Sequence, residues 1–209
     1  MARRGDRLRE HILWTAKDVF LEVGFERTSM DVLAARAETS KRTLYAHFEN
    51  KDALFVAVVD FVRGLHLNRL GTPEDYGDDR LAAVTGYCVG FLRSVVWVQS
   101  VRTCRLVIAE AERVPAAAAD FYDAIFATTR RNLAAFVAAK WQLPESEALA
   151  AVDEIFSLAI HPRFTAVLFG IEEAPDEWPE RQPATTDPDH ERIRRIVTGV
   201  LGAPDASSP

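Results

Sequence analysis

The fold is decided by one stretch of the chain, TSMDVLAARAETSKRTLYAHFENKDALF, which covers residues 28–55. Its spacing of apolar residues predicts two helices, near 29–37 and 41–48, joined by a turn of about three residues. Leu44 and Phe48 are one helical turn apart in the second helix, so they form the face that must be buried. Two short helices around such a turn have helix-turn-helix geometry.

Another face of the second helix is suited to DNA. Lys41, Arg42 and Tyr45 share this face, and Thr43 and His47 flank it. An arginine can bind guanine O6 and N7 with two hydrogen bonds, and a lysine can do so less tightly. The tyrosine can reach a phosphate or a thymine methyl group. We expect Thr43 and His47 to contact phosphates. A basic helix considered alone is more often a solvated surface, so the prediction depends on the whole stretch.

The starts of the helices offer further contacts to phosphate. Thr28, Ser40 and Asn50 can cap three successive helices, because their side-chain oxygens can accept hydrogen bonds from free backbone N–H groups. A helix N-terminus also attracts anions. We therefore expect Thr28, Ser29, Ser40 and Lys51 to lie near the DNA backbone. Taken alone, Ser40 and Asn50 are more often plain caps than phosphate contacts.

Composition and charge exclude several classes of protein. The 209 residues are 48% hydrophobic and 27% charged, which is typical of a globular protein. The net charge is −6, but residues 1–54 carry +1 and residues 55–209 carry −7, so a positive site can exist at the N-terminal end. No uncharged run approaches the ~20 residues of a membrane span. Lys17 and Asp18 interrupt any apolar leader, so we expect a cytoplasmic protein.

The pattern outside the first stretch is also helical. It predicts an all-α protein of about nine helices, near residues 6–23, 29–37, 41–48, 51–68, 78–98, 100–113, 116–141, 144–169 and 189–201. Pro162 lies inside the eighth of these helices, so we expect a kink near His161. We divide the chain into a helix-turn-helix domain, residues 1–54, and a larger helical domain, residues 55–209.

These residues resemble a known family. TSMDVLA at 28–34, followed by SKRTLYAHFENKDALF at 40–55, is strongly similar to the DNA-binding domain of TetR-family transcriptional regulators. The resemblance covers about residues 6–56. It implies that the helix at 41–48 enters the major groove, with Lys41, Arg42 and Tyr45 toward the bases. It also implies that Thr43, His47 and Lys51 face phosphates.

The chain departs from the family pattern in the turn before this helix. The family usually has a glycine and a β-branched apolar residue there, where this chain has Glu38 and Thr39. If Glu38 adopts the left-handed conformation, we expect a strain of ~1 kcal/mol. Where the family often has a second glycine, this chain has Arg42, which gives more weight to Arg42 as the residue that reads a base.

The rest of the chain resembles the family loosely, through RLVIAEAERVP at 105–115. In such proteins the C-terminal domain dimerises and often holds an effector pocket. Our candidates for effector contacts are Tyr87, Phe91, Cys104, Phe121 and Ile125, although aromatic stripes are core more often than pocket. Few cations are expected among the buried residues, so the small-molecule effector should be apolar or cationic.

Other kinds of chemistry find no support in the sequence. The five histidines are scattered without metal-ligand spacing, and no nucleophile elbow or phosphate-binding glycine loop is present. We therefore expect no metal, no cofactor and no enzymatic activity. Cys88 and Cys104 are expected to be buried thiols rather than a redox sensor.

The last two predicted helices carry apolar stripes that predict a homodimer. The stripes consist of Val152, Ile155, Phe156 and Ala159 on the first helix and Ile193, Ile196, Val197, Val200 and Leu201 on the second. The alternative is that both helices only close the core of their own chain.

The leading hypothesis is a ligand-responsive transcriptional repressor. It would bind a palindromic operator in double-stranded DNA as a homodimer and be released by the effector. The alternative hypothesis is an all-helical protein-interaction module that does not read DNA.

Overall fold

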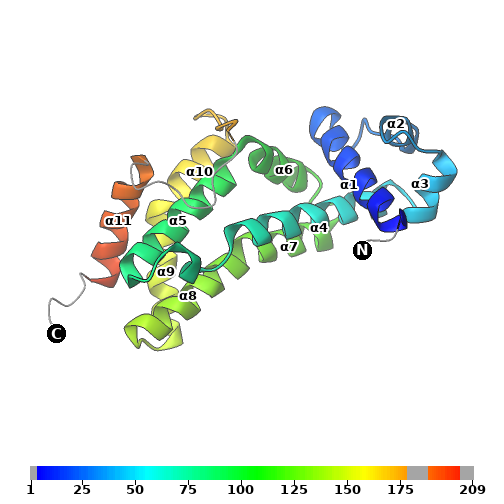
Figure 1. Cartoon of the computed structure of the whole chain (residues 1–209). Helices are drawn as coiled ribbons and strands as arrows, with labels where there is room; N and C mark the ends of the chain where they lie inside the picture. The colour runs from blue at the N-terminus through cyan, green and yellow to red at the C-terminus, as the bar shows by residue number, and fades with distance from the viewer. Residues whose placement is uncertain (1–3, 178–187, 203–209) are drawn as a thin grey trace. The chain divides into compact units, whose positions relative to one another are not determined.

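The computed structural model describes residues 4–177 and 188–202. The regular structure in these residues is helical throughout (Figure 1), which confirms the predicted all-α class. The chain forms two compact units, and each contains two stretches of the sequence. Unit 1 contains Met1–Leu65 and Arg102–Asp123, and unit 2 contains His66–Val101 and Ala124–Pro209. The unit that includes the predicted 1–54 domain therefore also includes a much later segment.

Unit 1 is built around the predicted helix-turn-helix. Its helices are α1 (Arg4–Val23), α2 (Met30–Arg36), α3 (Lys41–His47), most of α4 (Lys51–Leu70), the second part of α6 (Val98–Ala109), and α7 (Pro115–Tyr122). Phe20, Phe25 and Phe55 form an aromatic cluster with ring centroids 5.3 to 5.7 Å apart. Leu44 and Phe48 are buried, as the sequence predicts. Burial of these side chains fixes which face of α3 remains outside.

Unit 2 is built around α5 (Arg80–Val96). Its other elements are the 3₁₀ turn η1 (Pro73–Tyr76), the first part of α6, most of the π-helical turn η2 (Asp123–Ala127), α8 (Thr128–Trp141), α9 (Glu145–Ala159), α10 (His161–Leu168) and α11 (Pro188–Leu201). Helix α5 is buried without interruption from Ala83 to Leu92, because α8, α9, α10 and α11 all pack against it.

Two glycines of α5 permit a close contact with η1. The Tyr76 ring lies over Gly86 and Gly90, where an added Cβ would stand 3.1 Å from Tyr76 Cβ and 2.6 Å from Tyr76 Oη. The same hydroxyl donates a hydrogen bond to the Leu70 carbonyl at 2.9 Å, at the end of α4. A larger residue at position 90 would therefore displace the ring that ties this end of α4 to α5.

Two of the nine predicted helices are divided in the structure. The helix predicted at 144–169 is interrupted at Ile160, and α10 begins at His161 with Pro162 in its first turn. This confirms the predicted kink, since proline cannot donate the helical hydrogen bond and clashes with the preceding turn. The helix predicted at 116–141 contains the π-helical turn η2, which the sequence did not indicate.

No single helix in the described residues is long and apolar enough to cross a bilayer. Helices α5 and α6 together are long and apolar enough, but the chain bends by 65° between them.

Candidate nucleic-acid interface

Helices α2 and α3 are joined by a tight turn. The Thr39 amide donates to the Ala34 carbonyl at 2.9 Å, and the Glu38 amide donates to the Ala35 carbonyl at 3.2 Å. These two bonds form a Schellman motif, which places the residue after the cap in the left-handed region. Glu38 has a φ of 48°, so it adopts the left-handed conformation in which strain is expected. The turn is therefore formed without glycine, at the cost of local strain.

Side chains cap α3 and α4 as predicted. Ser40 Oγ accepts a hydrogen bond from the Thr43 amide at 3.0 Å and lies 2.8 Å from Thr43 Oγ1. Asn50 Oδ1 accepts from the Ala53 amide at 2.8 Å. These bonds satisfy backbone donors that each helix leaves free, so they fix where α3 and α4 begin.

The cap of α2 differs from the prediction. Ser29, and not Thr28, is the capping residue, with its Oγ accepting from the Val32 amide at 3.3 Å. Thr28 is only 2% exposed, and its hydroxyl donates to the Gly24 carbonyl at 2.7 Å. The hydroxyl of Ser29 is thus at the surface, whereas that of Thr28 closes the corner between α1 and α2.

The outward face of α3 carries the three predicted base contacts. Arg42 and Tyr45 are exposed, and among the described residues the Arg42 guanidinium has no hydrogen bond or ion pair. Lys41 Nζ lies 2.6 Å from Asp31 Oδ2 on α2, and both side chains are more than half exposed. A pair this exposed is weak, so DNA could displace it. Within the described part of the chain, Arg42 and Tyr45 have no intramolecular partner that DNA would have to displace.

Thr43 and His47 lie at the flanks of this face. Both are half-buried. Thr43 Oγ1 is hydrogen-bonded to Ser40 Oγ, and the centroid of the His47 ring lies 6.2 Å from that of the Phe48 ring. The phosphate contacts of both residues stay predictions.

Lys51 has an arrangement that the sequence did not indicate. Its Nζ donates to the carbonyls of Phe25 at 2.9 Å, Glu26 at 3.4 Å and Thr28 at 2.8 Å. It also lies 4.1 Å from the centroid of the Phe25 ring. The ammonium group therefore uses its three donors to hold the loop between α1 and α2. The predicted contact of this side chain with phosphate would have to replace some of these bonds.

The five candidate effector residues are all buried. Tyr87, Phe91 and Ile125 belong to unit 2, and Cys104 and Phe121 belong to unit 1. Burial raises the pKa of the Cys104 thiol to about 12, and it raises that of Cys88 equally. Neutral buried thiols are poor nucleophiles, so the structure favours the predicted structural role for both cysteines.

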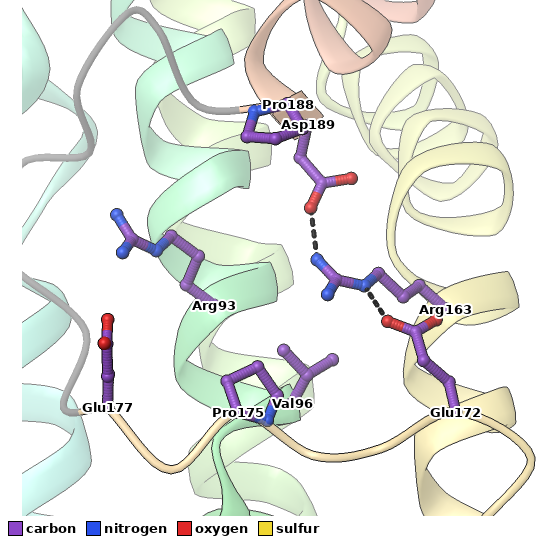
Figure 2. Close-up of a pocket in the computed structure, with 8 residues that line it drawn as sticks. All are labelled: Arg93, Val96, Arg163, Glu172, Pro175, Glu177, Pro188 and Asp189. Carbon is purple, nitrogen blue, oxygen red and sulfur yellow. Dashed lines mark hydrogen bonds and ion pairs between the residues drawn. The ribbon is translucent and has the colours of Figure 1, made fainter.

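A polar pocket lies in unit 2, among α5, α10, the segment after α10 and the start of α11. Figure 2 shows its eight lining residues, among them two arginines and three carboxylates, with a cavity volume of about 340 Å³. Arg163 Nε donates to Glu172 Oε1 at 2.6 Å, and Arg163 Nη1 donates to Asp189 (Figure 2). Burial acts to lower the pKa of Arg163, but these two carboxylates outweigh it and raise that pKa. The pocket is lined by none of the five candidate effector residues, and its charged walls are unsuited to an apolar ligand.

An apolar groove of about 630 Å³ lies on α10 and the turn that follows it. It is open to solvent and is lined by His161, Pro162, Thr165, Ala166, Phe169 and Ile171. The side chains of Phe169 and Ile171 are 76% and 83% exposed, and Leu158 at the end of α9 is 50% exposed. Large apolar groups this exposed on a helical surface indicate an interaction site.

Comparison with protein families matches both parts of the chain. Residues 12–58 match the model described as bacterial regulatory proteins of the tetR family. Residues 82–186, half of the chain, match the model described as the C-terminal domain of AefR-like transcriptional repressors.

Two curated relatives each match a short stretch of the chain. The chain is 42% identical over 62 residues to the HTH-type transcriptional activator FasR of Mycolicibacterium smegmatis, covering 27% of this chain and 28% of that protein. It is 38% identical over 60 residues to the DNA-binding transcriptional repressor TetR of Mycobacteroides abscessus, covering 29% and 32%. The matched stretch thus spans about a third or less of these relatives.

Solved structures match nearly the whole fold. The flavonoid-responsive regulator FrrA has a TM-score of 0.68 at 25% identity, with 94% of each chain covered. A TetR transcriptional regulator from Agrobacterium tumefaciens has a TM-score of 0.68 at 22% identity, with 93% of this chain and 92% of that chain covered. Members of this family are DNA-binding regulators and not enzymes. Since family models match both the helix-turn-helix and the C-terminal half, the chain belongs to the TetR family of transcriptional regulators.

Proposed function

We propose that this protein is a transcriptional repressor that binds a two-fold symmetric DNA operator as a homodimer and is released by a small apolar effector. The observation that carries the DNA-binding part is the outward face of α3, where Arg42 and Tyr45 are exposed and have no partner among residues 4–177 and 188–202. The caps and the Schellman turn hold this face rigidly relative to α2. A rigid helix that presents an arginine is suited to read a guanine in the major groove.

Contacts to the DNA backbone complete this model. The exposed Ser29 and Ser40 hydroxyls lie at the starts of α2 and α3, and Thr43 and His47 lie on the flanks of α3. Phosphates are commonly bound at such positions, which supports these four contacts. Lys51 holds the loop before α2 through three carbonyls, so we assign its side chain first to positioning. Thr28 is buried and takes the same supporting role.

Repression is favoured over activation by the extent of the matches. The repressor model covers residues 82–186, whereas the match to the activator FasR covers 62 residues. A small-molecule effector is supported by FrrA, which is described as flavonoid-responsive. Release would follow if the effector binds more tightly to a dimer whose two α3 helices no longer fit successive major grooves, ~34 Å apart.

The homodimer would use the surface of α9, α10 and α11. Much of the predicted stripe on α9 is buried in its own chain, since Val152, Ile155 and Ala159 have no exposed surface. On α11, Ile193 and Val197 are buried in the same way. The apolar side chains that stay at least partly exposed include Leu158, Phe169 and Ile171, together with the half-buried Ile196 and Val200 of α11. We propose that these residues form the two-fold interface, in which the same patch serves both subunits.

Sedimentation of Leu158→Glu/Phe169→Glu tests the interface. The wild-type protein should sediment as a dimer and this variant as a folded monomer. Ile108→Glu is the control, because Ile108 is 61% exposed but lies on α6. A variant that remains dimeric would refute the interface, and a monomeric wild type would refute the dimer.

Selection of duplexes from a randomised DNA library tests the function itself. The wild-type protein should select a palindrome, and Arg42→Ala should relax the preference at one base pair of each half-site by ~1–3 kcal/mol. Arg36→Ala is a matched control, because Arg36 pairs with Glu22 and lies on α2. If the wild type selects no sequence, the protein-interaction alternative is favoured.

A further inference from the structure

We infer that Arg113 is a positioning residue for DNA binding, which ties the helix-turn-helix to the segment Arg102–Asp123. Through this residue, a movement of the segment would change the position of α3. The inference rests on the proposed function and adds a residue that regulates the same DNA-binding site.

Arg113 makes four side-chain contacts within unit 1, the longest of them 5.8 Å from its guanidinium carbon to the centroid of the Phe55 ring. Its guanidinium carbon lies 3.5 Å from the centroid of the Phe25 ring. Its Nη1 forms an ion pair with Asp52 in the first turn of α4, and its Nε donates to Glu110 Oε2 at 2.8 Å. Glu110 is 8% exposed, so it holds the arginine from the inner side. A planar guanidinium can stack on a ring and bind carboxylates at its edge at the same time, which an ammonium group cannot do.

Phe25 stands at the corner of the DNA-binding unit. It follows Gly24, whose positive φ ends α1, and its ring packs on Phe20 of α1 and Phe55 of α4. The Lys51 ammonium also contacts this ring, while it binds the Phe25 carbonyl. The corner that orients α2 and α3 is therefore held by two cations that come from different parts of the sequence.

The segment that carries Arg113 continues into unit 2 at both ends. Its first residue, Arg102, lies inside α6, and its last, Asp123, is the first residue of the π-helical turn η2. A rearrangement in unit 2 can thus pull on this segment through the covalent chain. Arg113 contacts Asp52 at the start of α4 as well as Phe25, so such a pull would reach the helix-turn-helix at two points.

The spacing between operator half-sites distinguishes positioning from plain stabilisation. Arg113→Met should lower affinity for the duplex that the wild type selects by about tenfold, a typical magnitude for coupling. It should also bind duplexes with one or two base pairs inserted between the half-sites nearly as well as the original. Base preferences within each half-site should stay unchanged. Arg102→Met, an exposed arginine of α6, is the control and should keep the wild-type spacing preference.

Charge reversal and hydrogen exchange complete the test. Asp52→Arg and Arg113→Asp should each relax the spacing preference, and the double variant should restore part of it. Amides of residues 24–30 should exchange faster in Arg113→Met than in the wild type and in Arg102→Met. An Arg113→Met protein with wild-type spacing preference, or with wild-type exchange at 24–30, would overturn the inference. A wild type that selects no duplex would overturn the proposed function and this inference together, while normal selection with unchanged spacing would overturn the inference alone.

Discussion

Replacing Glu38 by glycine should stabilise the protein. The residue has a φ of 48°, and the left-handed conformation costs an L-residue ~1–2 kcal/mol. Glycine removes that cost but adds freedom to the unfolded chain, worth ~0.5–1 kcal/mol. The difference between the two ranges is ~0–1.5 kcal/mol, and we take ~1 kcal/mol as the expected gain in the free energy of unfolding. For a chain of this length, such a gain raises the melting temperature by ~2–4 °C.

Glu38→Gln is the control in a calorimetric melt at pH 7. It removes the charge but keeps the left-handed strain, so its melting temperature should equal that of the wild type. Both variants should bind non-specific DNA slightly more tightly, because each removes a negative charge beside the predicted DNA face. Gln142→Gly should give a similar gain, because Gln142 has a φ of 56° at the end of α8, without changing DNA affinity. If Glu38→Gly has the same melting temperature as Glu38→Gln, the strain argument is wrong.

Three other predictions concern single contacts. Asp31→Asn should raise DNA affinity by a few-fold at low salt, because it frees Lys41 from its ion pair with Asp31. If the variant and the wild type bind equally well in a gel shift, the Lys41–Asp31 pair is already open in solution. Lys51→Met should lower the free energy of unfolding by ~1–3 kcal/mol in a urea titration, because three carbonyls lose their hydrogen-bond donor. If the Lys51 side chain served only to contact phosphate, the substitution would leave stability unchanged. Burial raises the pKa of Cys88 and Cys104 to about 12, so both thiols are neutral at pH 8. Iodoacetamide should therefore label both cysteines in urea but not in the native protein, and labelling of the native protein would contradict their burial.

Features that depend on local pattern could be predicted from the sequence. The apolar spacing placed the helices to within a few residues, and Pro162 marked the break before α10 because its effect is a property of one residue. Ser40 and Asn50 were found as caps, since each is the hydroxyl or amide residue directly before a helix. At α2, two adjacent hydroxyl residues could both cap, and only the fold decides that Thr28 turns inward and Ser29 caps.

Features that depend on distant parts of the chain could not be predicted. Lys51 binds carbonyls more than twenty residues earlier, and Arg113 binds Asp52 sixty-one residues earlier. No local pattern indicates such pairs, so a lysine near a predicted DNA face was assigned to phosphate. The burial of Val152 and Ile155 is similar, because an apolar stripe does not show whether its partner is the same chain or a second copy.

The π-helical turn η2 marks a place where this chain can lose one residue without changing its core. A π-turn holds one residue more than the α-helical turn it replaces. Deleting one residue between Asp123 and Ala127 would convert η2 into an α-helical turn and join α7 to α8 in one continuous helix, while the later side chains of α8 keep their direction about its axis. Leu133 and Val137, which are fully buried, would then stay in the core. A relative that lacks this residue can therefore keep the same face of α8, so an alignment gap at η2 marks a change in local helix geometry rather than a different core.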